Sequence, residues 1–403
     1  MTAAAPRTRR TCAAAATAAW RKRVEAASHT LSVRRRRRFT APVTQGGGAR
    51  AYHVTIGGDG GADYKFDDLA DLKKELEDLR TKIKEAQQAA VDKTFAEALK
   101  DVDKEARFRL KQRKVLKGHI SKVTSAHFCG DSKKAVSGSL DGKLIIWDVF
   151  SGNKMRVIPL RSSWVMACAY NDNGNFAAVG GMDNMCTVYD LRGAGPKVRR
   201  ELTGMDGYLS SVRFLGDSQV ITGSGDTRVV LWDLERGVKM TTYEAHEGDV
   251  ISLSLHPDKT SFVTGSVDNT ARLWDIREKE CRQTFREHTA DVSSVYFHAS
   301  GQAFATASED KTCGLFDIRS DQQVCRYQNP RESSAFTCCG LSLSGRLLMA
   351  GSDDHDVHVW DTLSTRRIGT LTGHENKVTA LTISPDGVVV VTGSWDSSVR
   401  VWG

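Results

Sequence analysis

Two patterns of hydrophobic and polar residues divide the chain. Over residues 66–91, apolar residues recur in alternating steps of three and four among charged side chains, which is the a/d spacing of a coiled-coil helix. The apolar positions are Leu69, Leu72, Leu76, Leu79, Ile83, Ala86 and Ala90. Such a stripe is not stable alone in water, so it needs a partner. We favour a helix from another chain over the flank of the domain that follows.

The second pattern is a repeat of 42 to 44 residues, in which each unit carries an Asp six residues before an aromatic residue. The pairs are Asp141–Trp147, Asp183–Tyr189, Asp226–Trp232, Asp268–Trp274, Asp310–Phe316, Asp354–Trp360 and Asp396–Trp402. A period near 40 to 45 residues that ends in Trp-Asp indicates four-stranded propeller blades. We therefore predict an all-β, seven-bladed WD40 propeller over residues 110–403. A coiled-coil α-helix and its connector precede it over residues 66–109.

Other side chains recur at fixed positions within the units. In four units a His lies 22 residues before the Asp, and in five a Ser or Thr lies four before it. Imidazole, hydroxyl and indole groups can supply the hydrogen bonds that a buried carboxylate needs. The complete structural sets are His119, Ser137, Asp141 and Trp147; His246, Thr264, Asp268 and Trp274; and His374, Thr392, Asp396 and Trp402. Units two and six lack both the His and the hydroxyl, and we expect incomplete units to be weaker.

Catalysis is not expected from these residues. Ser, His and Asp can form a hydrolase site, but such a site is normally single, whereas this set recurs. The cluster Asp353, Asp354, His355, Asp356 and His358 could in principle hold a metal. Its members alternate around a turn and a strand, so they point to opposite faces. The sequence also lacks a G-x-x-x-x-G-K-[ST] phosphate loop. We predict no enzyme, no metal site and no cofactor.

The end of the repeat predicts how the ring closes. The last unit stops at Val401-Trp402-Gly403, which is its third strand. We expect the segment from Leu110 to Leu116 to supply the fourth strand, because joining the first blade to the last removes an open edge.

Charge is concentrated at the N-terminus. The first fifty residues hold 12 Lys or Arg and one acid, a charge of +11, so the stated +8 leaves −3 for the remainder. This tail could be a transit peptide, or could bind nucleic acid or anionic lipid. We favour a disordered extension over residues 1–65, or a mistaken start codon, because no aromatic residues are patterned with the arginines. No nucleic-acid binding is expected for the propeller.

The remaining signals are absences. Nine cysteines are scattered without a C-x-x-C pair, which favours a reducing compartment over a disulfide framework. No stretch reaches the apolar length of a membrane span, and no terminal Cys offers a prenylation site.

Several stretches resemble one known family. The most specific are residues 141–148 (DGKLIIWD), 158–170 (IPLRSSWVMACAY), 281–285 (CRQTF), 344–348 (SGRLL) and 393–397 (GSWDS). With the heptad helix, they resemble the β subunit of heterotrimeric G proteins over residues 66–403. The resemblance does not include the basic tail.

The resemblance implies an obligate dimer with a small γ subunit, whose coiled coil would pair with Leu69, Leu72, Leu76, Leu79, Ile83 and Ala86. It also implies that one face of the ring binds the GDP-loaded α subunit and, after release, effectors and regulators of receptor signalling. The protein would be cytoplasmic and would reach the inner face of the plasma membrane only through a prenylated γ subunit.

The resemblance also implies the residues of that face. They are Ile120, Lys122, Lys143, Ile145, Lys154, Ser163, Trp164, Met166, Met182, Asn184, Tyr208, Asp249, Ile251, Asp291, Glu309 and Trp395. Trp164, Tyr208 and Trp395 are large amphipathic anchors of the kind that dominate interface energetics. Thr124, Ile251 and Ser293 depart from the family, where Tyr, Met and Asn are usual. The alternative is a cytosolic scaffold that resembles the receptor for activated C kinase, which would need neither the heptads nor the Trp164 stretch.

Overall fold

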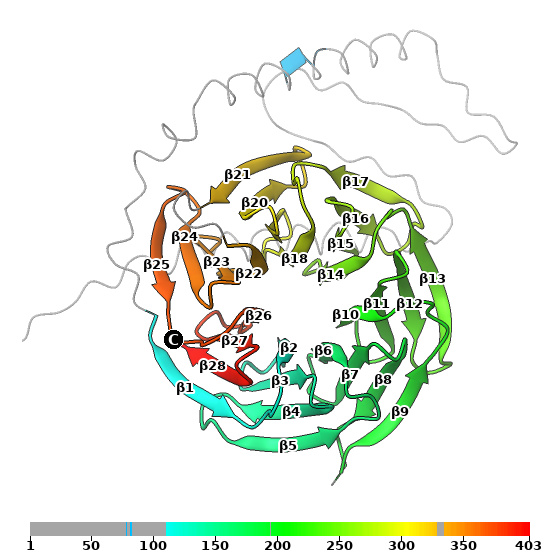
Figure 1. The fold of residues 1–403 in the computed structure, drawn as a ribbon. Coiled ribbons are helices and arrows are strands. Elements are labelled where there is room, and N and C mark those ends of the chain that lie inside the picture. Colours follow the sequence, from blue (N-terminus) through cyan, green and yellow to red (C-terminus); the bar gives the residue numbers. More distant parts are fainter. Residues whose placement is uncertain (1–77, 79–80, 83–109, 194, 329–333) are drawn as a thin grey trace, which may run out of the picture. The chain divides into compact units, whose positions relative to one another are not determined.

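The computed structural model describes residues 78, 81–82, 110–193, 195–328 and 334–403. Over these residues the chain forms seven four-stranded sheets, arranged as a ring (Figure 1). The predicted seven-bladed propeller is therefore confirmed. The predicted coiled-coil helix lies outside the described residues, apart from Asp78, Thr81 and Lys82, and so does the basic extension.

In blades 1 to 6 the strands follow sequence order from the inner strand to the outer one. Blade 1 comprises β2 (Val123–Phe128), β3 (Lys134–Ser139), β4 (Lys143–Asp148) and β5 (Lys154–Pro159). Blade 2 comprises β6 (Val165–Tyr170), β7 (Phe176–Gly181), β8 (Cys186–Asp190) and β9 (Lys197–Leu202). Blade 3 comprises β10 (Leu209–Phe214), β11 (Gln219–Ser224), β12 (Arg228–Asp233) and β13 (Val238–Glu244).

The next three blades repeat this order. Blade 4 comprises β14 (Val250–Leu255), β15 (Ser261–Ser266), β16 (Ala271–Asp275) and β17 (Cys281–Phe285). Blade 5 comprises β18 (Val292–Phe297), β19 (Ala303–Ser308), β20 (Thr312–Asp317) and β21 (Gln322–Gln328). Blade 6 comprises β22 (Phe336–Leu341), β23 (Leu347–Ser352), β24 (Val357–Asp361) and β25 (Arg367–Leu371).

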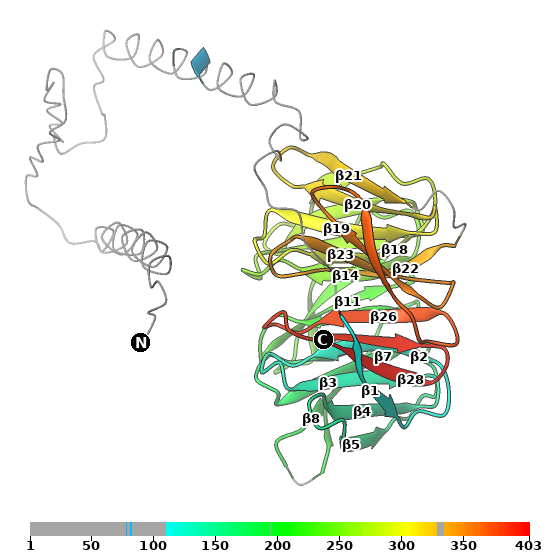
Figure 2. The ribbon, with the colours of Figure 1, turned by 90° about the vertical axis from the view of Figure 1, so that its left-hand side faces the viewer.

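Blade 7 closes the ring with strands from both ends of the described chain. It comprises β26 (Val378–Ile383), β27 (Val390–Ser394), β28 (Ser398–Trp402) and, as its outer strand, β1 (Gln112–Lys117). β1 runs antiparallel to β28, and the two lie side by side in Figures 1 and 2. Arg113 Nε also donates to the Gly403 carbonyl at 2.6 Å. The expected source of the missing strand is thus confirmed.

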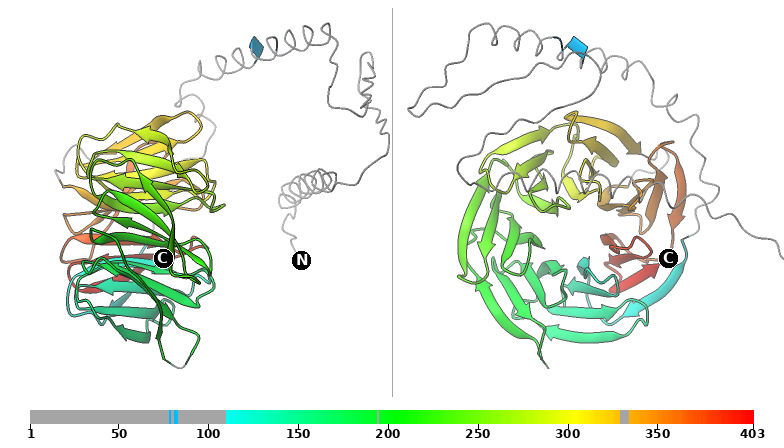
Figure 3. Two further views of the ribbon diagram at one scale, coloured as in Figure 1. Left: turned by 90° about the vertical axis from the view of Figure 1, so that its right-hand side faces the viewer. Right: turned by 180° about the vertical axis from the view of Figure 1, so that it is seen from behind.

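Burial distinguishes the middle strands of the blades from the outer strands. The middle strands are nearly continuous apolar runs, such as Leu144 to Trp147 on β4, because neighbouring blades cover both faces. The outer strands expose most of their residues, as β13 does, and bury single anchors such as Tyr243. The cores lie between blades, because each cluster of buried apolar side chains combines residues of neighbouring blades, such as blades 2 and 3 or blades 1 and 7. Figure 3 shows the same ring from one side and from behind.

The repeated Asp lies in the turn between the second and third strands. In every blade the residue after it has a left-handed backbone, with φ between 56° and 75°: Gly142, Asn184, Thr227, Asn269, Lys311, His355 and Ser397. Gly and Asn adopt this conformation most readily, and the other types hold it at some cost. The Asp accepts hydrogen bonds across the turn, as from Lys143 N to Asp141 Oδ1 at 3.0 Å.

The predicted sets of four side chains are in contact in blades 1, 4 and 7. His119 Nδ1 lies 3.1 Å from Asp141 Oδ2, and its Nε2 lies 2.7 Å from Ser137 Oγ. Trp147 Nε1 donates to the same hydroxyl at 2.8 Å. The equivalent His–Asp distance is 2.8 Å in both other blades, through His246 and Asp268 and through His374 and Asp396. Each set ties a loop to two strands of one blade.

The incomplete blades use substitutes. In blade 5, Gly314 N donates to Thr306 Oγ1 at 3.2 Å, where Phe316 offers no indole. Blade 6 lacks the loop His, as predicted, but His358 on β24 places Nε2 2.9 Å from Asp354 Oδ2. The sequence analysis did not foresee this substitute. His358 and Asp354, two members of the cluster considered as metal ligands in the sequence, are therefore hydrogen-bonded to each other.

Candidate protein-binding face

One edge of the ring collects the segments that carry the predicted binding residues. Successive strands of a blade run antiparallel, so the turn between the second and third strands lies at the same edge as the loop into the next blade. Trp164, in the loop before β6, therefore meets Met182, in the turn after β7. Met182 N donates to the Trp164 carbonyl at 3.0 Å.

Three apolar side chains are exposed at this edge. The exposed fraction is 57% for Trp164, 52% for Met182 and 79% for Ile120. Trp164 N donates to Ser162 Oγ at 3.3 Å, which helps to hold the loop that presents the indole. Ile120 N donates to Asp141 Oδ2 at 3.1 Å, so the structural Asp of blade 1 also fixes this loop. Large exposed apolar side chains gathered on one edge are typical of interaction sites.

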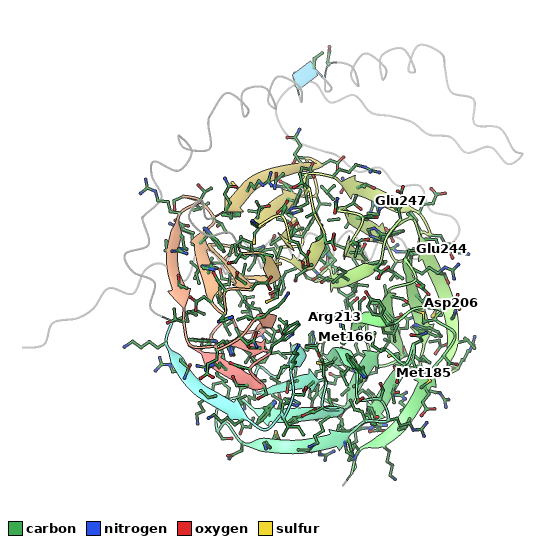
Figure 4. All side chains as sticks on the ribbon, viewed as in Figure 1. Met166, Met185, Asp206, Arg213, Glu244 and Glu247 are labelled. Atoms are coloured by element: carbon green, nitrogen blue, oxygen red, sulfur yellow. The ribbon has the colours of Figure 1, made fainter. Side chains whose placement is uncertain are left out.

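The first strands surround a funnel of about 610 Å³ that opens at this edge. Many predicted residues line it: Lys122, Trp164, Met166, Met182, Tyr208, Ile251, Glu309 and Trp395. Figure 4 shows Met166 at the inner side of the ring. The funnel also includes Thr124 and Ser293, so all three positions that depart from the resembled pattern, Ile251 among them, line it.

Trp395 is held by two lysines. The Lys122 ammonium lies 3.6 Å from the ring centroid and the Lys377 ammonium 5.5 Å from it. Both distances allow cation–π attraction. Lys377 Nζ also lies 2.8 Å from Asp353 Oδ1, so the rim is charged and polar around its aromatic side chains. Sequence reasoning did not single out Lys377, because only the ring geometry brings it to Trp395.

Tyr208 and Asp249 form a second fixed pair. Tyr208 donates its hydroxyl to Asp249 Oδ2 at 2.9 Å. Burial, and then this hydrogen bond to a carboxylate, raise the pKa of Tyr208 to about 12. The phenol therefore stays protonated at neutral pH and keeps Asp249 in place.

The other predicted residues do not line the funnel. Ile120, Ser163, Asn184, Asp249 and Asp291 lie in the loops and turns of the same edge, and Lys143 is the first residue of β4. Ile145 differs from the prediction, because it lies within β4 with only 1% of its surface exposed and so cannot touch a partner. Lys154 lies on the outer strand β5, with its ammonium 5.9 Å from the Trp147 ring centroid. Its ammonium also lies beside Gly118, just after β1.

Arg213 was also missed. It lies on the inner strand β10, and Figure 4 shows it beside the centre of the ring. A charged residue in an inner strand was the one signal in the sequence that could have marked it.

In the described part of the chain, the His, Cys, Asp and Glu side chains form no group of three or more that could hold a metal ion. The eight cysteines within the described ranges are free thiols. None of the described residues belongs to a helix with the length and apolar character of a membrane span.

The ring and its edge define a class of protein. Exposed aromatic and apolar side chains within a charged rim match the composition of protein-binding surfaces. The molecule is thus a WD-repeat propeller built for interaction with other proteins. The family model described as G protein beta WD-40 repeat protein matches residues 66–403, and the chain belongs to that family.

Proposed function

We propose that the protein is the β subunit of a heterotrimeric G protein. In this role it pairs with a γ subunit, binds the α subunit in its GDP form and, when released, binds effectors. It acts by binding and not by catalysis. The observation that carries the proposal is the exposed Trp164 at the mouth of the funnel, in a chain whose family match spans residues 66–403.

The chemistry of the edge supports a partner that brings both apolar and charged groups. Trp164, Met182 and Ile120 offer apolar area to bury. Lys122 and Lys377 on one side and Glu309 on the other offer charges of both signs at the funnel. Aromatic anchors give most of the binding energy at such interfaces, and the charged rim guides association and specificity.

The proposed contact with a γ subunit, and through it with the membrane, involves the segment before the ring. The heptad positions from Leu69 to Ala86 would form the coiled coil with γ, and they lie outside the described residues. We expect the chain to reach the inner membrane surface through a prenylated γ subunit. Imaging of the full chain with and without γ tests this, and import into an organelle would support a targeting role for the basic tail.

The decisive experiment replaces Trp164 by Ala in the full chain, co-purified with a γ subunit. Loss of an aromatic anchor should weaken binding to the GDP-loaded α subunit by about 2 kcal/mol, or about thirtyfold. Phe150→Ala is the matched control, because Phe150 is 54% exposed but lies in the turn after β4, at the opposite edge. Affinity is measured by surface plasmon resonance, with the α subunit in its GDP and activated forms.

Two results would contradict the proposal. One is equal affinity of wild type and Trp164→Ala for the GDP-loaded α subunit. The other is a full chain that is folded and monomeric and does not bind γ, which would favour the alternative WD40 scaffold.

A further inference from the structure

The seven inner strands place equivalent residues at the same level of the central channel. The fifth residue of each strand forms one such level: His127, Ala169, Arg213, Ser254, Tyr296, Gly340 and Thr382. Below the funnel is a second cavity of about 390 Å³, and Arg213 lines both. Arg213 therefore lies at the waist between the two halves of the channel.

Most polar side chains near the waist accept a hydrogen bond from the next blade. Tyr170 N donates to His127 Nδ1 at 3.2 Å, and Phe297 N donates to Ser254 Oγ at 3.0 Å. Two positions earlier on the strands, Ser125, Ser252 and Ser294 accept from the next inner strand at 3.0, 3.1 and 3.3 Å. These bonds join neighbouring blades. Arg213 cannot take this role, because a guanidinium has only donors.

The Arg213 guanidinium has no anionic partner within the described residues. Its one hydrogen bond there runs from Nη1 to the Val212 carbonyl at 2.8 Å. Burial lowers the pKa of Arg213, yet a guanidinium remains charged in proteins. The carboxylates that line the channel lie towards its two mouths, as Glu309 in the funnel and as Asp172, which pairs with Lys259 at 2.6 Å. Arg213 is half-buried at the wall of the channel, and a charge that loses part of its water without gaining an anionic partner is costly, so its retention needs an explanation.

Several polar side chains that line the same cavities as Arg213 have hydrogen-bond donors without an acceptor among the described residues. Ser252 and Ser254 use their oxygens to accept backbone N–H groups and donate to no described atom, so their hydroxyl hydrogens are available. Burial, and then the charge of Arg213, lower the pKa of His127 to about 3, so the ring is neutral. Because its Nδ1 accepts from Tyr170, its Nε2 carries the hydrogen. Ser211 Oγ, which is buried beside the funnel, has no hydrogen-bond partner.

We propose that the waist of the channel binds a small oxyanion, of the inorganic phosphate or sulfate class, on Arg213. The guanidinium offers a planar fork that matches two oxygens of such an ion. Ser252, Ser254 and His127 line the same cavity as Arg213, and the Asp172 carboxylate in that cavity is paired with Lys259. The cavities on either side provide a route from solvent. This site is separate from the rim that carries the proposed function.

The test measures thermal unfolding of the full chain in sodium phosphate, sodium sulfate and sodium chloride at equal ionic strength. A ligand that binds only the folded state raises the Tm with the logarithm of its concentration. We expect this rise with phosphate or sulfate but not with chloride. Arg213→Gln, which keeps an amide donor but loses the charge, should abolish the rise. Arg228→Gln is the matched control, because Arg228 lies at the blade periphery in ion pairs with Asp206 and Glu244. It should retain the rise.

A second variant keeps the proposal testable if Arg213→Gln does not fold. Arg213→Lys keeps the charge but loses the fork, so the affinity measured by equilibrium dialysis of labelled phosphate should fall about tenfold. Wild type should bind one phosphate per chain. Equal effects of phosphate, sulfate and chloride on wild type, or an unchanged affinity in Arg213→Lys, would overturn the proposal. A phosphate response that survives in Arg213→Gln would do so as well.

Discussion

At the scale of single residues, Gly181 determines how Trp164 is presented. A Cβ at position 181 would lie only 2.1 Å from the Trp164 carbonyl oxygen, so no other side chain fits without moving that loop. The same carbonyl accepts the hydrogen bond from Met182. The anchor is thus placed by a backbone contact with the end of β7, the neighbouring strand of the same blade. The local sequence around Trp164 does not reveal this contact.

Gly181→Ala should therefore lower both stability and binding. We expect a loss of about 1–3 kcal/mol in the free energy of unfolding, as for other overpacked sites, together with weaker binding of the α subunit. Urea denaturation and plasmon resonance measure the two effects. Gly216→Ala is the control, because a Cβ there would meet nothing within 4 Å. Equal behaviour of both variants would contradict the role of Gly181.

The hydroxyl at the centre of a structural set gives a second prediction at this scale. Thr264 Oγ1 accepts from Trp274 Nε1 at 2.9 Å and lies 2.6 Å from His246 Nε2. Thr264→Val removes both contacts without changing the shape and leaves a buried indole N–H unsatisfied. We expect a loss of about 2 kcal/mol in the free energy of unfolding, measured with urea. Thr242→Val, on the outer strand β13, should cost much less, and a similar loss in both would speak against the set.

At the scale of the strand, ring closure depends on β1. Leu116 on this strand is buried, with 1% of its surface exposed, and it packs with residues of blades 1 and 7. Removing residues 1–118 should destroy the cooperative thermal transition, because β28 would become an open edge. Removing residues 1–109 keeps β1 and is the matched control. Calorimetry that shows the same transition for both truncations would refute this closure.

At the same scale, some features of the strands could be predicted from the sequence and others could not. The seven Asp–aromatic pairs predicted the blades because each Asp closes a turn at a fixed distance from the packed aromatic. Ile145 was wrongly assigned to the binding face. Leu144 to Trp147 are all apolar, so no alternation of polar and apolar residues shows which of them are buried. The hydrogen bond between His358 and Asp354 was not predicted, because His358 reaches the carboxylate from a strand and not from the loop. The role proposed for Arg213 could not be predicted, because it depends on the channel that the seven inner strands form together.

At the scale of the whole molecule, the structural carboxylates make stability depend on pH. Burial alone would raise the pKa of Asp268, Asp310 and Asp396. Hydrogen bonds from the paired His and from Thr270, Thr312 or Ser398 outweigh it, so each pKa lies below the ordinary value. Unfolded Asp titrates near pH 3.9, so protons bind the unfolded chain more readily. This contribution to stability is present above about pH 4 and is lost below it.

The free energy of unfolding should therefore fall steeply below about pH 4. A smaller loss should begin below about pH 6.5, because burial lowers the pKa of His119 and favours its neutral form in the folded ring. Urea denaturation between pH 7 and pH 3 measures the profile. Asp268→Asn should make the acid limb shallower without removing it, because Asp310 and Asp396 still contribute. Asp258→Asn, at an exposed turn, should leave the limb unchanged. An acid limb of the same steepness in Asp268→Asn and wild type would contradict the role of Asp268.

The pairing of β1 with β28 also sets the order of events during synthesis. β1 leaves the ribosome before every other strand of the ring, and its partner leaves after all of them. For that whole interval the nascent chain carries an unpaired strand and an open arc of blades, which are available to other chains. Closure can follow only after translation of β28. The period in which the protein is most prone to aggregate is therefore determined by its topology and not by the stability of any single blade.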